Sequence, residues 1–437
     1  MVKDKKVGVI SLGCDKNRVD TEKMLYLISE KHSIVSDILT AEIVIINTCA
    51  FLESSRKEAI DEILSVAELK REGNLEKLVI TGCLPQKFVG ELIDALPEVD
   101  AFTGVSDYAE ICSVIDRIYS GERVVCVKEP KDECLKSRVR TTDHYAYLKI
   151  ADGCDNHCTY CLIPSIRGKF RSAPKAELID EVKSLGKVKE LILVAQDLTK
   201  YGSDLEGVDL VDLINEISAL DGVEKIRLLY CYPEGINERL IECVKNNPKV
   251  VKYLDIPLQH ADDKVLKRMN RKGTGESYLN LINRLKQEIP SIALRSTFIT
   301  GFPGESEQAF NNLVEFIKSA QLFNAGFFAY SREEGTPAYK LDGQIDNKTK
   351  TARLKKLYST QKKVVKKILS GKVGEVVEVL AEGFDQDSFV YYGRAYFNAP
   401  EVDGKIYFFS ADEIEYGKLY SVRIDSVTDY DLYGERL

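Results

Sequence analysis

The sequence contains no apolar run long enough to cross a membrane. A spanning helix needs roughly 20 consecutive apolar residues, and no stretch of the chain approaches that length. The N-terminus, Met1 to Ser11, carries charges and then a short apolar run, and it has neither the length nor the cleavage pattern of a secretion signal. We therefore expect a cytosolic protein without a membrane partner, in a compartment where thiols stay reduced.

Positive charge is not in excess, and we find no internal repeat or low-complexity tract. The formal net charge of the 437 residues is −8, so the whole-chain charge gives no indication of nucleic-acid binding. Hydrophobic residues make up 44% and charged residues 30% of the chain, which is typical of a globular protein. At about 150 residues per domain, this length suggests about three domains.

Cysteine, in contrast, is abundant. The chain has 11 cysteines, and in a cytosolic protein they are better explained by metal binding or catalysis than by disulfides. Five of them match no ligand pattern, and we interpret these as structural: Cys112, Cys126, Cys134, Cys231 and Cys243.

Strand-like and helix-like segments alternate in the first two of three expected domains, which we place at residues 1–121, 140–368 and 369–437. In the first, β-branched runs at Val7–Leu12, Ile43–Thr48 and Leu78–Thr81 each precede a helical or polar pattern, which predicts an α/β domain with a parallel sheet. The charged segment 128–143, interrupted by Pro130, is typical of a linker.

The second domain has six candidate β/α units, which predict an open or partial (β/α)6 barrel, because a full eight-unit barrel needs about 250 residues. The candidate strands are Tyr145–Ala151, Glu190–Gln196, Lys225–Tyr230, Lys252–Ile256, Ala293–Thr300 and Ala325–Tyr330. Beyond Gly371 the pattern has a period of two, which predicts a small antiparallel β-barrel. Its candidate strands are Gly374–Leu380, Phe389–Ala395, Lys405–Phe409 and Leu419–Val427.

One cysteine group is compact: Cys154, Cys158 and Cys161 have the spacing C-x3-C-x2-C at the end of the first strand of the central domain. Three thiolates so close together can bind three irons of a [4Fe–4S] cluster and leave the fourth iron open to a small molecule. A structural zinc site is the alternative. It normally takes four ligands, with cysteines paired as C-x2-C, and His157 is wedged awkwardly between the cysteines for that purpose.

A second group is dispersed. Cys14, Cys49 and Cys83 lie 35 and 34 residues apart, and each directly follows an expected strand. The carboxyl ends of parallel strands share one edge, where ligands bind, so these cysteines could converge on a second three-thiolate cluster. From the spacing alone, cluster ligation and ordinary packing of these cysteines are about equally well supported, because buried cysteine is common.

The compact group, with an aromatic residue before its last cysteine, resembles the radical S-adenosylmethionine superfamily, whose fold is a partial (β/α)6 barrel. The resemblance implies that S-adenosylmethionine binds the open iron and is cleaved to a 5′-deoxyadenosyl radical. Tyr160 matches the position whose backbone contacts adenine, and Gln196 lies in the segment that binds the methionine amino group, although Gln-Asp here replaces the commoner Gly-Gly-Glu pattern. Gly301 belongs to the later backbone-contact motif.

Residues flanking the dispersed cysteines extend the resemblance to nearly the whole chain. The segments 11–17 (SLGCDKN), 47–51 (NTCAF) and 81–86 (TGCLPQ) are similar to the N-terminal domain of radical S-adenosylmethionine methylthiotransferases. That family joins this domain to a radical core and a C-terminal β-barrel, the TRAM domain. The resemblance implies two [4Fe–4S] clusters and S-adenosylmethionine as cofactors, with sulfide or polysulfide as sulfur source and an electron donor such as flavodoxin.

Within the family, one branch modifies an aspartate β-carbon of ribosomal protein S-twelve and another modifies tRNA adenosines. The segments 13–17, 163–169, 253–260 and 399–404 resemble the ribosomal-protein branch. Charge points the same way, because residues 369–437 contain 14 acidic and 6 basic residues, and an acidic module suits a basic protein better than RNA.

Two alternatives stay open. A tRNA adenosine methylthiotransferase would agree with nine basic residues in an expected helix at Lys348–Lys367, which could touch RNA. A charge run is, however, more often a solvated face. A non-catalytic iron–sulfur redox sensor would have no use for the motifs at the strand ends.

Overall fold

The computed structural model describes residues 4–131 and 137–437. Its N-terminal part is a six-stranded parallel sheet in the order β2-β1-β3-β4-β5-β6. The strands are β1 (Lys6–Ser11), β2 (Ser33–Ile34), β3 (Ile43–Thr48), β4 (Lys77–Gly82), β5 (Ala101–Thr103) and β6 (Val124–Cys126). The helices are α1 (Asp15–Ser29), α2 (Glu53–Arg71), α3 (Cys83–Ala95) and α4 (Ile111–Tyr119). The three strands expected from sequence are confirmed, and they are neighbours in the sheet.

The central part is a second six-stranded parallel sheet whose strands follow chain order, β7-β10-β11-β12-β13-β14. The strands are β7 (Tyr145–Lys149), β10 (Val188–Val194), β11 (Val223–Leu228), β12 (Val250–Asp255), β13 (Ala293–Thr300) and β14 (Asn324–Ala329). The helices are α6 (Lys175–Ser184), α7 (Leu210–Ser218), α8 (Glu238–Asn246), α9 (Asp263–Arg268), α10 (Gly275–Glu288) and α11 (Glu307–Ala320). The expected partial barrel is therefore confirmed.

The first expected core strand is shorter than its sequence suggested. The chain leaves the sheet after Lys149, and β8 (Ala151–Asp152) pairs with β9 (Arg171–Ser172) in a small antiparallel hairpin. This hairpin encloses the compact cysteine group and the short helix α5 (Ile163–Arg167). Short 3₁₀ turns lie in other connections, at Ile38–Thr40, Asp107–Glu110, Leu198–Lys200, Pro233–Gly235 and Pro337–Lys340.

The C-terminal part is a closed five-stranded barrel in the order β15-β16-β17-β19-β18. Its strands are β15 (Val376–Asp385), β16 (Val390–Arg394), β17 (Ile406–Phe409), β18 (Leu419–Val427) and β19 (Leu432–Arg436). The expected antiparallel pairing holds except between β17 and β19, which are parallel. The fifth strand, β19, was not among the expected strands.

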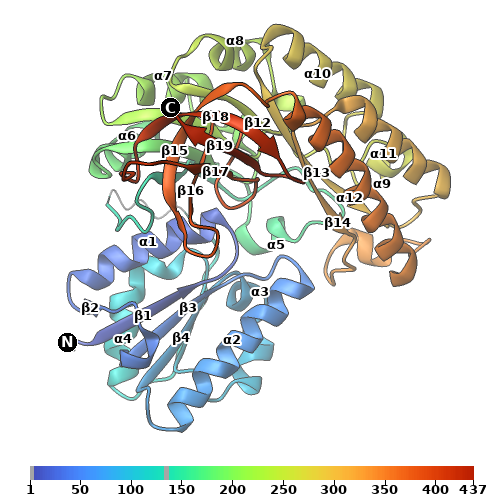
Figure 1. The fold of residues 1–437 in the computed structure, drawn as a ribbon. Coiled ribbons are helices and arrows are strands. Elements are labelled where there is room, and N and C mark those ends of the chain that lie inside the picture. The colour runs from blue at the N-terminus through green and yellow to red at the C-terminus, as the bar shows by residue number, and fades with distance from the viewer. Residues whose placement is uncertain (1–3, 132–136) are drawn as a thin grey trace.

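The C-terminal barrel lies against the concave face of the central sheet (Figure 1). Alternation along β10 shows why both faces of that sheet are apolar. Leu191 and Leu193 join the cluster under the helices, whereas Ile192 and Val194 join a cluster shared with the C-terminal barrel. The hydrophobic effect therefore holds the barrel in the arc of the core.

Helix α12 (Asn347–Ser370) connects the core to the barrel and packs against β14 and α11. The expected basic helix is confirmed, but two of its nine cations turn inward. Lys350 donates to the Tyr330 carbonyl, and Arg353 pairs with Glu305. The remaining seven lysines are exposed to solvent.

The N-terminal domain meets the core through α1 and α5 (Figure 1). The expected linker, residues 128–143, includes residues 132–136, which lie outside the described residues, as does Cys134. Its described end, residues 137–143, contacts α1 through Val139, whose N–H donates to the Glu22 carbonyl. In the described ranges no helix has the length and apolar character that a membrane crossing requires.

Candidate functional site

The compact cysteine loop is held by backbone contacts at both ends. The Cys154 N–H donates to the Gly168 carbonyl, and the Cys161 N–H donates to the Cys158 carbonyl. Backbone N–H groups of Asn156 and Ile163 approach the Cys154 and Cys161 sulfurs at 3.5 and 3.4 Å.

A buried arginine also lies beside the cysteine loop, although no sequence motif predicted it. The Nη1 atom of Arg271 is 4.0 Å from Cys158 Sγ. The three thiols interact electrostatically with one another, so they lie together as the spacing implied.

The three segments expected to contact S-adenosylmethionine converge on this loop. Gln196, just beyond β10, donates to Asp152 at 2.9 Å, and its neighbour Asp197 accepts a hydrogen bond from Asn156, inside the cysteine loop. The Gln196 Oε1 atom is buried without a hydrogen-bond partner among the described residues. An unsatisfied buried acceptor is costly, and a ligand amino group would satisfy it.

Tyr160 meets the segment that follows β13 and carries Gly301. The Tyr160 ring meets the ring of Phe302 edge-on, with centroids 6.5 Å apart. Gly301 has a φ of +73°, and a Cβ there would lie 2.4 Å from Lys350 Cγ of α12. Its N–H donates to buried Glu305. The contacts of Tyr160, Gln196 and Gly301 with S-adenosylmethionine remain a prediction.

The dispersed cysteines follow adjacent strands of the N-terminal sheet. Cys14 precedes α1, Cys49 follows β3, and Cys83 is the first residue of α3. Cys49 and Cys83 both interact electrostatically with Cys14, so the carboxyl edge of the sheet does bring the three together.

Two glycines explain how the backbones can approach so closely. A Cβ on Gly13 (φ +94°) would lie 2.6 Å from Cys49 Cβ, and one on Gly82 (φ +95°) would lie 2.3 Å from Asn47 Oδ1. The Gly-Cys steps at residues 13–14 and 82–83 are therefore a geometric requirement of this site.

Burial makes these sulfurs poor thiolates without a cation beside them. It raises the pKa of Cys83 and Cys161 to about 12 and that of Cys154 to about 11, and it also raises the pKa of the Cys49 thiol. A positive metal centre would reverse this preference, since metal ligation displaces the thiol proton.

Both sites suit an iron–sulfur cluster better than a single ion. Among the described residues no three His, Cys, Asp or Glu side chains converge closely enough to ligate one metal ion. A [4Fe–4S] cluster instead binds each thiolate through a separate iron. The all-thiol donor set fits that group at both sites.

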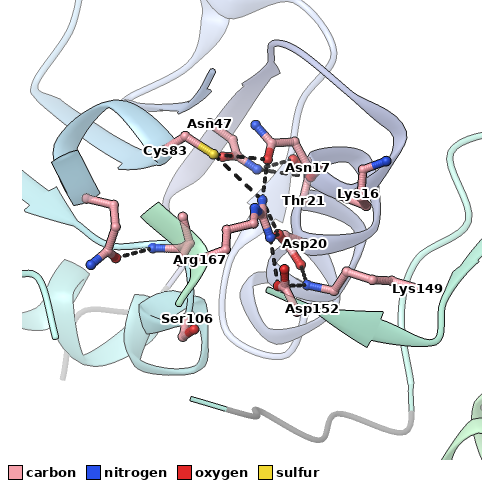
Figure 2. Close-up of polar contacts among 12 residues, drawn as sticks. Lys16, Asn17, Asp20, Thr21, Asn47, Cys83, Ser106, Lys149, Asp152 and Arg167 are labelled. Atoms are coloured by element: carbon pink, nitrogen blue, oxygen red, sulfur yellow. Dashed lines mark hydrogen bonds and ion pairs between the residues drawn. The ribbon is translucent and has the colours of Figure 1, made fainter. Parts of the chain in front are cut away.

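A polar network that no sequence motif predicted joins the N-terminal cysteine site to the core (Figure 2). Arg167, the last residue of α5, bonds Asp152 of the core and Asp20 of α1, and Lys149 pairs with the same two carboxylates. Burial alone would raise the pKa of Asp152, but Arg167 and Lys149 outweigh it and hold that pKa well below its usual range. Asp152 stays ionised, and the domains are joined by paired charges.

Two further polar residues of the core, Asp255 and Arg268, are held by protein partners. Asp255 is buried and pairs with Arg295 at 3.1 Å, inside the core. Arg268 donates a hydrogen bond to the Pro303 carbonyl and pairs with exposed Asp342. The remaining described cysteines are reduced: Cys231 and Cys243 are core residues, Cys112 donates to the Leu27 carbonyl, and Cys126 lies 3.5 Å from Glu110.

Family models match three segments of the chain. Residues 6–104 match "Uncharacterized protein family UPF0004", residues 148–317 match the radical SAM superfamily, and residues 373–437 match the TRAM domain. These segments carry the dispersed cysteines, the compact cysteines and the C-terminal barrel. The exact domain boundaries given above remain a prediction.

Solved structures share the fold at low sequence identity. The chain is similar to the radical S-adenosylmethionine methyltransferase TsrM from Kitasatospora setae, with a TM-score of 0.59 and 14% identity over 77% of each chain. It is also similar to the cobalamin-dependent radical enzyme OxsB, with a TM-score of 0.53 and 13% identity over 83% of this chain and 56% of that one.

Curated relatives are much closer and cover nearly the full length. The "Ribosomal protein uS12 methylthiotransferase RimO" of Acetivibrio thermocellus is 47% identical over 99% of this chain and 98% of its own. The proteins of that name from Clostridium botulinum and Thermoanaerobacter are 45% and 44% identical, each over at least 97% of both chains. The resemblance seen in the sequence is confirmed, and the chain belongs to the RimO family of radical S-adenosylmethionine methylthiotransferases.

Proposed function

We propose that this enzyme adds a methylthio group to the β-carbon of an aspartate on ribosomal protein uS12, using two molecules of S-adenosylmethionine and a sulfur donor. One observation carries the proposal: a single chain holds two three-cysteine sites at opposite ends of α5. Cys161 lies two residues before this helix, and Arg167 at its end reaches Cys83 of the other site. One site can then make a radical while the other presents sulfur to it.

The compact site is where S-adenosylmethionine would bind. A [4Fe–4S] cluster held there by Cys154, Cys158 and Cys161 would supply the electron that cleaves the sulfonium. The residues around it orient the substrate: Gln196 offers a buried acceptor to the amino group, and the Tyr160–Phe302 pair forms an apolar wall. Because Gly301 has no side chain, the backbone there can lie close to Lys350 of α12.

The dispersed site is where sulfur would be held. Cys14, Cys49 and Cys83 suit a second [4Fe–4S] cluster that keeps one iron free of protein ligands. Sulfide or polysulfide on that iron, or sulfur from the cluster itself, would provide the methylthio sulfur. An electron donor such as flavodoxin would serve the compact site.

Charge and kinship support the choice of protein over RNA. The names of the relatives specify uS12, and the region 369–437 has an excess of eight acidic residues. A basic partner is attracted to such a surface. The exposed lysines of α12 offer the opposite charge, so contact with nucleic acid is compatible with the structure but is not the basis of the proposal.

A competition experiment tests the substrate. Anaerobically reconstituted enzyme would receive S-adenosylmethionine, a reductant, sulfide, uS12 and bulk tRNA together, and mass spectrometry would follow both macromolecules. A methylthio mass gain on an aspartate of uS12 is expected. A gain on tRNA adenosine with unmodified uS12 would instead favour the tRNA branch of the family.

A further inference from the structure

We propose that Arg167 is a positioning residue of the N-terminal three-cysteine site, supplied to it by the central domain. This inference rests on the proposed function, because it takes Cys14, Cys49 and Cys83 as the ligands of an iron–sulfur cluster. It adds that the site is composite. The ligands come from one domain, and the cation that faces them comes from the other.

The guanidinium lies directly against the site. Arg167 is 1% exposed, and its Nη2 atom is 3.8 Å from Cys83 Sγ and 2.6 Å from Asn17 Oδ1. Figure 2 shows the side chain reaching from α5 toward Cys83 and Asn17. Its charge also acts on Cys14 and Cys49.

Asn17 extends this contact to the other two ligand segments. Its Nδ2 donates to the Leu12 carbonyl at 3.1 Å and to the Thr48 carbonyl at 3.0 Å. Leu12 lies two residues before Cys14, and Thr48 immediately precedes Cys49. One arginine therefore touches the third ligand and, through a single amide, fixes the backbones that carry the first two.

Charge balance explains why a permanent cation stands here. Arg167 and Lys149 face Asp20 and Asp152, so this buried quartet is neutral by itself. Every thiolate formed at the site then adds negative charge next to a guanidinium that cannot lose its proton.

The consequence concerns the reduction of the cluster. Reduction adds one negative charge to a group already held by three thiolates, and nearby charge and hydrogen bonds to sulfur set the potential. A cation that donates an N–H toward Cys83 stabilises the reduced form. Arg167 therefore makes the N-terminal cluster easier to reduce, and docking of the two domains sets its potential.

The test isolates the N-terminal cluster in the full-length chain. A parent variant with Cys154, Cys158 and Cys161 changed to Ala would be reconstituted anaerobically with iron and sulfide. Iron content would be measured, and the midpoint potential would be found by dithionite titration monitored by electron paramagnetic resonance. Arg167→Met removes the cation, whereas Arg167→Lys keeps the positive charge but loses the planar guanidinium with its several N–H donors.

Arg138→Met is the matched control. Arg138 is also a fully buried arginine between α1 and the core, where it pairs with Glu22 and Glu181 and donates to the Tyr147 carbonyl. Its guanidinium thus faces carboxylates and a carbonyl, whereas that of Arg167 also faces a cysteine sulfur. A merely structural effect of losing a buried interface arginine would appear in both variants.

We expect the midpoint potential of Arg167→Met to be more negative than that of the parent by at least about 59 mV. For one electron, this shift corresponds to a tenfold change in the reduction equilibrium. Arg167→Lys should fall between it and the parent, and Arg138→Met should match the parent. Loss of iron in Arg167→Met but not in Arg138→Met would equally support the positioning role. Equal shifts in Arg167→Met and Arg138→Met, or none in either, would overturn it. A parent that binds no iron would refute the second cluster itself.

Discussion

At the scale of single residues, the N-terminal site depends on glycines, which have no side chain, as much as on its three cysteines. Gly82 has no side chain because Asn47 and Thr48 occupy the space that a Cβ would need. The left-handed backbone at this glycine turns the chain from β4 into α3, and Cys83 begins that helix. The position of the third sulfur is thus fixed by its neighbour.

Gly82→Ala should destabilise the protein and lower the iron content after reconstitution. The backbone of Gly82 (φ +95°, ψ −150°) lies in a region that almost only glycine adopts, and another residue there costs about 1–3 kcal/mol. The contact with Asn47 adds to this. Gly73→Ala is the control, because Gly73 has a φ of +81° but nothing lies within 4 Å of the place where its Cβ would be. Urea denaturation should show a larger loss for Gly82→Ala. Equal losses would mean that the close approach at the site has no energetic effect.

His260 gives the core a dependence on acid. Burial lowers its pKa to about 3, and its Nδ1 accepts a hydrogen bond from the Asp262 N–H, while Glu305 and Arg353 lie nearby. The unfolded chain takes up a proton as pH falls through about 6.5, whereas the folded chain does not until about pH 3. Stability is therefore lost on acidification within this window.

His260→Asn should remove this part of the pH dependence. At pH 5 the wild type should have lost about 2 kcal/mol through this residue, and the variant should not show that loss. Chemical denaturation at pH 7, 6 and 5 measures the difference. Parallel stability curves for the two proteins would show that His260 is not a source of acid sensitivity.

At the scale of elements, strand β10 connects the core to the C-terminal barrel by charge as well as by apolar packing. Glu190 is buried and pairs with Arg227 of β11 and Arg394 of β16. Burial alone would raise the pKa of Glu190, but Arg227 and Arg394 outweigh it and lower that pKa. The carboxylate is thus ionised between two buried guanidinium groups.

Glu190→Gln should cost about 3–5 kcal/mol, the usual effect of removing one partner of a buried charge cluster. Glu224→Gln, on the neighbouring strand β11, removes an exposed partner of Lys189 and should cost about 0–1 kcal/mol. Thermal or urea unfolding of both variants distinguishes them. A cost for Glu190→Gln as small as that for Glu224→Gln would show that the barrel does not depend on this cluster.

At the scale of the whole molecule, the C-terminal barrel packs against the central sheet and shares an apolar cluster with it. Ile192, Val194 and Tyr253 of the central sheet share an apolar cluster with barrel residues such as Phe397 and Phe408. A chain that ends at residue 371 would expose this face to water. We expect such a truncation to aggregate or to bind a hydrophobic dye, and a stable monomer without dye binding would contradict this arrangement.

The sequence predicted the elements better than their docking. Periodicity identified the six core strands and the basic helix. The C-x3-C-x2-C spacing identified the compact cysteine group, and the position of each cysteine after a strand identified the dispersed group. The strands β5 and β6 have three residues each, too few to show a period. Arg167 lies in segment 163–169, which resembled the family, but its contact with Cys83 spans 84 residues and two domains. No local pattern encodes such a contact.

We propose that the two cysteine groups have separate tasks in one reaction. The most direct measurement is the yield of 5′-deoxyadenosine and of methylthiolated uS12 from two variants, Cys158→Ala and Cys83→Ala. We expect Cys158→Ala to form neither product, whereas Cys83→Ala should still form some 5′-deoxyadenosine without transferring the methylthio group. Methylthio transfer at the wild-type rate by Cys83→Ala would contradict the claim.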